Sequence, residues 1–282
     1  MRLVLKVDSA ITDNRDCGRK LAESVASLSH DGHYLAIIQG DVLEQRLEVS
    51  SVPNVQLKAG PSNGNNTAFG GANVAAMTTI SLKGWNLAGC LSRAGVPSMG
   101  LSCTDANICH LRRKFGDIDT NAFQLEASRV DPRWIEVICS NGGVPVISNA
   151  FLGELSQYGP VDPDQLAAVC AVHWNADALI FLTDSAGVRD TAGAVIRYLE
   201  IERIDSLPSA SSQKSIPAAL LKACKHALEH GVRRVRILPV SSIESLQLFY
   251  FSRIEHGTEV VKATEIIKAI NDPIAVRQTA AV

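Results

Sequence analysis

Residues 162–190, DPDQLAAVCAVHWNADALIFLTDSAGVRD, decide the fold of this chain. Residues 163–175 space their apolar side chains as an amphipathic helix does, and Asp162 is placed to cap its N-terminus. Residues 178–182 then form an unbroken apolar run, which is typical of a strand covered on both faces in a parallel sheet. The polar sequence TDSAGVRD begins where that strand ends. A helix, a buried strand and a polar loop in this order predict a ligand site at the carboxyl end of a parallel sheet.

The N-terminal segment predicts a unit of the same kind. Residues 2–7, RLVLKV, indicate a first strand, a helix follows from about Asn14 to Ser29, and the run YLAIIQGDV indicates a second strand that ends near Gln39. This βαβ order predicts parallel pairing with a right-handed connection. Lys6 lies at the end of the first strand, where its ammonium would either point at the mouth of the sheet or sit in solvent as a surface lysine.

The rest of the chain continues to alternate between helix and strand patterns, with Gly- and Asn-rich segments between them. We expect a loop over residues 60–73 and a surface loop over residues 190–217. The last strand, in HGTEVV, is expected to close the sheet. Helices are predicted at about 74–94, 132–141, 217–230 and 242–249, and from Lys262, with strands in VPSMGLSC, 123–130, VPVISNAFL and GVRRVRILPV.

Composition excludes several classes of protein. The chain has 282 residues, which allows one large α/β domain or two lobes that share a sheet. Its net charge of −2 argues against a nucleic-acid or membrane-surface partner. The seven cysteines form no CxxC pair, so we expect reduced core residues of a cytoplasmic protein. The start is too short in apolar length for a signal peptide, and no apolar run is long enough to span a membrane.

Three segments carry a resemblance to a known family. Residues 176–190 are similar to a strand and nucleotide loop that usually reads LILLTDVPGVxD. Residues 81–108, SLKGWNLAGCLSRAGVPSMGLSCTDANI, are similar to a helix, an RAG turn and a GLSGxDGxxI segment. Residues 235–261 are similar to the last strand, helix and closing GT. On these segments the chain resembles the amino acid kinase family, and within it the N-acetylglutamate kinases of arginine biosynthesis.

The resemblance implies a three-layer α/β/α sandwich with a mainly parallel sheet of about eight strands. An N-terminal lobe, about residues 1–160, would hold an acyl-amino-acid, and a C-terminal lobe, about 161–282, would hold the nucleotide. The implied reaction transfers the γ-phosphoryl group of ATP, with Mg²⁺, to a carboxylate. A homodimer is also implied, by analogy alone.

The resemblance also assigns site residues. Lys6 matches the lysine that contacts the transferring phosphoryl group, and Asp164 matches the aspartate that holds the catalytic lysines. Taken by itself, Asp164 could equally be a first-turn residue favoured by the helix dipole. The positions that match the phosphate and nucleotide loops are Ser9, Gly40, Thr183, Asp184, Gly187 and Val188.

Several positions depart from the family pattern. The first loop, usually KxGGS, reads KVDS at residues 6–9, so both glycines are missing and Asp8 stands in their place. The second loop, usually HGGGP, reads QGDV at residues 39–42 and keeps only Gly40, followed by Asp41. Glycine lets backbone N–H groups approach phosphate oxygens, so these changes should weaken phosphate binding. In N-acetylglutamate kinases an arginine clamps the substrate carboxylate, but the matching residues 65–73 contain no arginine. The second catalytic lysine has no clean match, although Lys214 could serve, as could Lys222.

Two hypotheses therefore remain open. One is an active kinase that phosphorylates N-acetylglutamate or a related acyl-amino-acid. The other is a catalytically impaired relative that keeps the fold and acts as a nucleotide-binding or regulatory subunit. A dehydrogenase of Rossmann type is excluded because no GxGxxG follows the first strand. No metal site is predicted, because His110, His173 and His226 have no suitable partner spacing.

Overall fold

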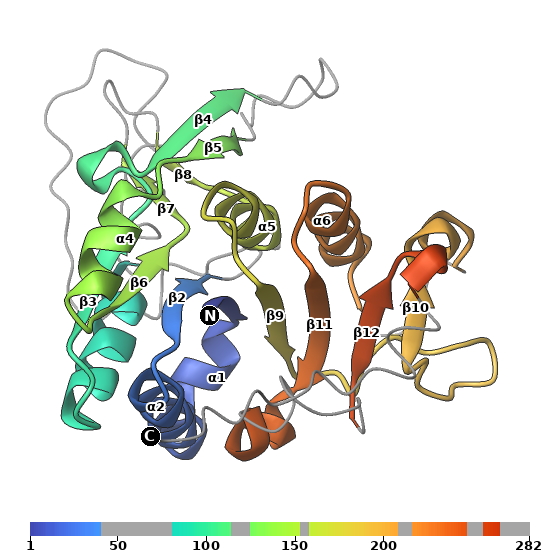
Figure 1. Ribbon diagram of the computed structural model, residues 1–282, viewed down its shortest axis with the longest axis horizontal. Helices are drawn as coiled ribbons and strands as arrows, with labels where there is room; N and C mark the ends of the chain where they lie inside the picture. Colours follow the sequence, from blue (N-terminus) through green and yellow to red (C-terminus); the bar gives the residue numbers. More distant parts are fainter. Residues whose placement is uncertain (41–80, 114–124, 153–157, 208–215, 247–255, 266–282) are drawn as a thin grey trace, which may run out of the picture.

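The protein is built around one large sheet with helices on both faces (Figure 1). The eight strands lie in the order β10-β12-β11-β9-β1-β2-β6-β3, and six of the seven pairings between neighbours are parallel. This confirms the predicted α/β class. The computed structural model describes residues 1–40, 81–113, 125–152, 158–207, 216–246 and 256–265.

The strands of this sheet are short, and the central ones are buried on both faces. In β1 the four residues Leu3, Val4, Leu5 and Val7 have no exposed surface, which explains why the strand reads as an unbroken apolar run. The sheet strands are β1 (Arg2–Val7), β2 (Tyr34–Gln39), β3 (Ser98–Ser102), β6 (Val144–Ser148), β9 (Ala178–Thr183), β10 (Tyr198–Glu200), β11 (Arg234–Pro239) and β12 (Thr258–Val261).

Helices form a layer on each side of the sheet. Helix α5 (Pro163–His173) and helix α6 (Ala218–Glu229) pack on one face together with α4 (Arg133–Ser140). Helix α2 (Arg15–His30) and the helical residues 81–93 pack on the other. The sequence therefore predicted the three-layer sandwich correctly.

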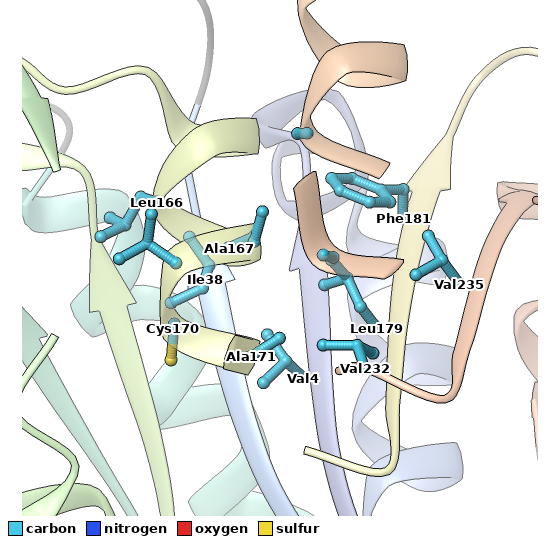
Figure 2. Packing of buried hydrophobic residues seen from close by; sticks show 14 of the residues in the cluster. Val4, Ile38, Leu166, Ala167, Cys170, Ala171, Leu179, Phe181, Val232 and Val235 are labelled. Carbon is cyan, nitrogen blue, oxygen red and sulfur yellow. The ribbon is translucent and has the colours of Figure 1, made fainter. Parts of the chain in front are cut away.

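The face covered by α5 holds a continuous hydrophobic core. Its core joins Val4, Ile38 and Phe181 of three neighbouring strands to Leu166 and Cys170 of α5 (Figure 2). Each fully buried aliphatic or aromatic side chain of this kind contributes about 1.5–3 kcal/mol to folding. Because that packing is continuous, the first turn of α5 is held firmly over the end of β1.

Two parts of the sheet differ from the prediction. The expected surface loop over residues 190–217 contains β10 and a 3₁₀ segment, η3 (Ile201–Ser206), and the strand β10 forms the edge of the sheet. The last strand, β12, therefore does not close the sheet but lies between β10 and β11, antiparallel to β11. Strand β10 was missed because three residues are too few to show alternation. The residues that the structure describes in the predicted helix 242–249 begin as a 3₁₀ segment, η4 (Val240–Ser245).

Two short hairpins stand outside the sheet. Strands β4 (Cys109–Arg113) and β5 (Leu125–Val130) pair antiparallel, and β5 confirms the strand predicted over residues 123–130. The predicted strand VPVISNAFL divides into β6 and β7 (Ala150–Leu152), and β7 pairs with β8 (Tyr158–Pro160). A one-turn helix, α1 (Ser9–Asp13), follows β1. The predicted loop 60–73 lies outside the described residues.

Most of the cysteines lie in the core. All seven cysteines are free, and five of them are buried. Burial raises the pKa of the Cys139 thiol to about 12, and that of Cys170 is also well above its ordinary value because of burial. No helix among the described residues has the length and apolar character that a membrane crossing requires.

Candidate functional site

The order of the strands puts a site at the carboxyl end of β1. On one side of β1 the strands lie in the order β2, β6 and β3, and on the other side in the order β9, β11, β12 and β10. Ligands of open α/β sheets bind where the strand order reverses in this way. The register aligns Val7 of β1 with Leu182 of β9, so Asp8 and Thr183 follow at the same edge.

Lys6 is buried at this edge. Its side chain is only 3% exposed, and its register partners are Ile38 on β2 and Phe181 on β9. Those two residues belong to the core beneath α5, so Lys6 lies on the α5 face of the sheet. The surface-lysine alternative is therefore wrong.

Asp164 meets Lys6 from the first turn of α5. The carboxylate oxygen Oδ1 of Asp164 lies 2.9 Å from Lys6 Nζ, and the Asp164 side chain is 2% exposed. The predicted cap is confirmed, because Asp162 Oδ1 accepts hydrogen bonds from the backbone N–H of Asp164 at 2.9 Å and of Gln165 at 3.0 Å. Asp164 is thus more than a residue favoured by the helix dipole, since it forms a buried ion pair with the central lysine.

Asp8 is the second ionic partner of Lys6. Its Oδ1 contacts Lys6 Nζ, and its side chain is 29% exposed. One ammonium therefore faces two carboxylates, one fully buried and one in contact with water. The sequence showed Asp8 in place of a glycine, but only the tertiary structure shows that its carboxylate is bound to Lys6.

The titration of this cluster reflects both burial and charge. Burial opposes the Lys6 ammonium, but the carboxylates of Asp164 and Asp8 outweigh burial, so the pKa of Lys6 is raised. Burial raises the pKa of Asp164, and the nearby Lys6 ammonium offsets only part of that change. Lys6 is therefore a firmly charged cation at neutral pH.

The predicted nucleotide loop follows β9 as a compact, hydrogen-bonded turn. The Thr183 hydroxyl donates to the carbonyl of Ser185 at 3.1 Å and accepts from the Ser185 N–H at 3.2 Å. The Ser185 hydroxyl in turn donates to the Gly187 carbonyl at 3.2 Å. Asp184 is exposed between these residues. The loop is thus shaped by its own side chains before any ligand arrives.

Gly187 and Val188 tie this loop to β12. The Val188 N–H donates to Thr258 Oγ1 at 2.9 Å, and that hydroxyl donates to the Ile196 carbonyl at 2.7 Å. Gly187 has a φ of +130°, and a Cβ there would lie 2.8 Å from Thr258 Oγ1. Thr258 is a supporting residue that the sequence did not single out, although it belongs to the GT pair of the resemblance.

Gly40 owes its identity to the close approach of Asn149. A Cβ at Gly40 would lie 2.2 Å from Asn149 Oδ1. Asn149 is fully buried between β6 and β7, and its Nδ2 donates to the Val161 carbonyl at 2.7 Å. Its backbone N–H donates to the Gln39 carbonyl at 3.2 Å. Asn149 therefore joins the ends of β2 and β6 to the segment before α5, and the only signal in the sequence was a polar residue after an apolar strand.

The remaining polar residues considered for the site make no contact with Lys6 that the structure describes. Ser9 begins α1 directly after Asp8, so its backbone lies at the same edge. Asp190 is a loop cap, because its Oδ1 accepts from the N–H groups of Ala192 and Ala194, each at 2.9 Å. Lys214 lies outside the described residues. The described part of the chain contains no group of three or more His, Cys, Asp or Glu side chains that could hold a metal ion.

Comparison with known proteins agrees with this architecture. The model of the amino acid kinase family matches residues 1–239. The chain belongs to the amino acid kinase family. Among curated proteins, the chain is 33% identical over 269 residues to the acetylglutamate kinase of Acidobacterium capsulatum, with 93% of this chain and 99% of that protein covered. It is 32% identical over 263 residues to the acetylglutamate kinase of Koribacter versatilis, with the same coverage.

Two solved structures share the fold. The N-acetylglutamate synthase from Neisseria gonorrhoeae, complexed with coenzyme A and N-acetyl-glutamate, matches with a TM-score of 0.69 at 23% identity. That match covers 93% of this chain and 59% of the synthase chain, so the chain spans about three fifths of that protein. Carbamate kinase from Giardia matches with a TM-score of 0.61 at 10% identity, covering 93% of this chain and 98% of that one.

Proposed function

We propose that this member of the amino acid kinase family transfers the γ-phosphoryl group of MgATP to the carboxylate of an N-acyl amino acid, as an acetylglutamate kinase does. The observation that carries the proposal is the buried Lys6–Asp164 pair at the carboxyl ends of β1 and β9. A cation fixed at this point is what phosphoryl transfer between two anions needs, because negative charge builds up there in the transition state. The likeness to two acetylglutamate kinases over nearly their whole length supports the substrate class.

The roles follow from position. Lys6 would stabilise the moving phosphoryl group, and Asp164 would hold the ammonium in place. The adenine nucleotide would lie against the loop from Thr183 to Val188, in the lobe of about residues 161–282. The acyl-amino-acid would lie in the lobe of about residues 1–160.

Most residues at this edge would favour a bound nucleotide, whereas the Asp8 carboxylate would not. The loop after β9 is held by its own hydrogen bonds and by Gly187 at positive φ, so it would be formed before a nucleotide binds, and Ser9 and Gly40 would lie beside the phosphates. Mg²⁺ would arrive with the phosphates and neutralise part of their charge. Lys214 is our candidate for the second lysine. The Asp8 carboxylate, which contacts Lys6, would oppose the phosphates.

A second function has one specific observation in its favour. Because Asp8 already binds Lys6, the lysine is less available to a phosphate than a lysine beside a glycine pair would be. A relative with this feature could keep the nucleotide loop and act as a nucleotide-binding or regulatory subunit. A homodimer stays a prediction for either function, and sedimentation equilibrium tests it.

One experiment separates the two functions. Binding of MgATP is measured by calorimetry, and turnover with N-acetylglutamate and a panel of N-acyl amino acids is followed by trapping the acyl phosphate with hydroxylamine. We expect trapped product with the wild-type protein, no product with Lys6→Met, and unchanged product with Lys20→Met, which removes a half-exposed lysine that pairs with Glu244. Asp164→Asn, which should reduce turnover without removing the lysine, covers the case in which Lys6→Met does not fold. Tight MgATP binding without turnover on any substrate would reject the kinase and leave the regulatory function.

A further inference from the structure

The two carboxylates on Lys6 are held in different ways. Asp164 is 2% exposed and belongs to a helix whose first turn is capped by Asp162. Asp8 is 29% exposed and lies in the connection between β1 and α1. A carboxylate that already touches water loses little hydration when it moves, whereas a buried one would have to be rehydrated. Asp8 is therefore the partner that can leave Lys6.

The side chain of Asp8 has no role in capping the helix that follows it. Asp8 is the N-cap residue of α1, with φ −78° and ψ 152°, but its side chain makes no cap hydrogen bond. Two other N-cap residues, Asn14 and Asp162, each accept two backbone N–H groups. Aspartate favours N-cap positions because of that bond. At Asp8 the carboxylate instead contacts the Lys6 ammonium.

We propose that Asp8 is a specificity-determining counter-ion, which occupies the side of the Lys6 ammonium that a transferring phosphoryl group requires. This inference rests on the proposed function of the site. A terminal phosphate can reach Lys6 only when Asp8 moves away, because two anions beside one ammonium repel each other. The contact therefore weakens binding of nucleotides that carry a terminal phosphate and leaves the binding of shorter nucleotides nearly unchanged.

The charge balance points in the same direction. Lys6 with Asp8 and Asp164 sums to one negative charge, so a polyanion meets a site that is already anionic. Without Asp8 the remaining pair is neutral, and the Lys6 ammonium gains a free direction for a phosphate oxygen. Asp8→Asn keeps the size of the side chain and removes its charge, which makes it the informative substitution. Asp8→Glu keeps the charge and serves as the conservative variant.

The test compares two nucleotides by calorimetry. The probes are the magnesium complex of a non-hydrolysable ATP analogue, which carries a terminal phosphate, and AMP, which does not. We expect Asp8→Asn to bind the ATP analogue about tenfold more tightly than the wild type and AMP within about twofold. Asp8→Glu should behave as the wild type. The matched control is Asp13→Asn, which removes one charge from the exposed Lys83–Asp13 pair and should change neither affinity.

The outcomes separate this inference from the function beneath it. Equal gains for both nucleotides, or no gain for the analogue when the wild type binds it, would overturn the role of Asp8 alone. A gain of the same size in Asp13→Asn would also overturn it, because the effect would then be one of net charge. Absence of nucleotide binding in every variant would overturn both the inference and the proposed function. Melting curves measured alongside show that each variant is folded.

Discussion

Substitution of Lys6 by methionine gives a direct measure of the charge buried at Asp164. Methionine keeps the length and the apolar stem of lysine, so the substitution removes the ammonium with little change in packing. Asp164 would then be a carboxylate with a 2% exposed side chain and no cation beside it. Asp8 would lose the same partner, but its 29% exposure lets water replace the ammonium.

The expected loss is large. Removing one partner of a buried ion pair costs about 3–5 kcal/mol, because it leaves an uncompensated charge in a poorly hydrated place. A typical domain is stable by only about 5–15 kcal/mol, so Lys6→Met should be strongly destabilised and still measurable. The double variant Lys6→Met/Asp164→Leu replaces both charges with apolar groups. Its stability should return to within about 1–2 kcal/mol of the wild type.

The loss should also depend on pH. Burial already raises the pKa of Asp164 above its ordinary value, and Lys6 is a cause that lowers it, so loss of Lys6 raises that pKa further. A carboxyl whose pKa is higher in the folded than in the unfolded state stabilises the fold while protonated, and that stability is lost as pH rises through the folded pKa. Lys6→Met should therefore be least stable at neutral and higher pH and should recover as the pH falls toward the acidic range.

Urea denaturation at pH 7.5 and pH 5.5 tests this reasoning. The wild type, Lys6→Met and the double variant are followed by far-ultraviolet circular dichroism, and the free energies of unfolding are compared. If Asp164 is left as an uncompensated charge, Lys6→Met loses less unfolding free energy at pH 5.5 than at pH 7.5. The double variant is then also more stable than Lys6→Met. If the deficit is the same at both pH values and the double variant is no more stable than the single one, Asp164 is not an uncompensated charge.

Two further predictions concern the support of the nucleotide loop and the buried ion pair of β11 and β12. Gly187→Ala should lower the free energy of unfolding, measured by denaturation, by about 2–4 kcal/mol, because φ at Gly187 is +130° and a Cβ would lie 2.8 Å from a threonine oxygen. The control Gly193→Ala, at φ +84° with open space around it, should cost about 1 kcal/mol. Equal losses in the two variants would show that close packing at Gly187 is not the cause. Glu259→Gln should lower the stability of the fold by about 3 kcal/mol or more, because it removes the carboxylate that lies 2.9 Å from the buried Arg236 guanidinium. The control Glu23→Gln, in an exposed ion pair, should cost less than about 1 kcal/mol. Similar losses of the two variants in thermal melts would show that burial is not the cause.

The sequence by itself determined the fold class and the edge of the sheet at which the site lies. Apolar runs such as those of β1 and β9 have no polar interruption, and this pattern is local, so it can be recognised without knowledge of partners. The cap at Asp162 is local as well, since its bonds span only two and three residues. The resemblance to the family came from residues 81–108, 176–190 and 235–261, and the family model matches residues 1–239.

Other features were fixed only by packing between distant segments. The pairing of Lys6 with Asp164 was suggested by the resemblance alone, because those residues meet only when α5 folds over the end of β1. The need for glycine at position 40 follows from Asn149, which belongs to another strand, and β10 was too short to be recognised before it paired with β12. Neither contact leaves a periodic trace in the chain, since each depends on which strands become neighbours.

The contact between Asp8 and Lys6 shows most clearly what the sequence determines and what only the tertiary structure decides. The sequence determined that a carboxylate stands where a glycine is usual, and therefore that phosphate binding should be weakened. Only the tertiary structure decided where that carboxylate is directed. It binds Lys6 because β1 turns into α1 directly after the lysine, and because Asp164 leaves one side of the ammonium open to a second anion. The physical reason is that local patterns specify elements, whereas the partner of a charge is chosen by the burial and geometry that those elements create together.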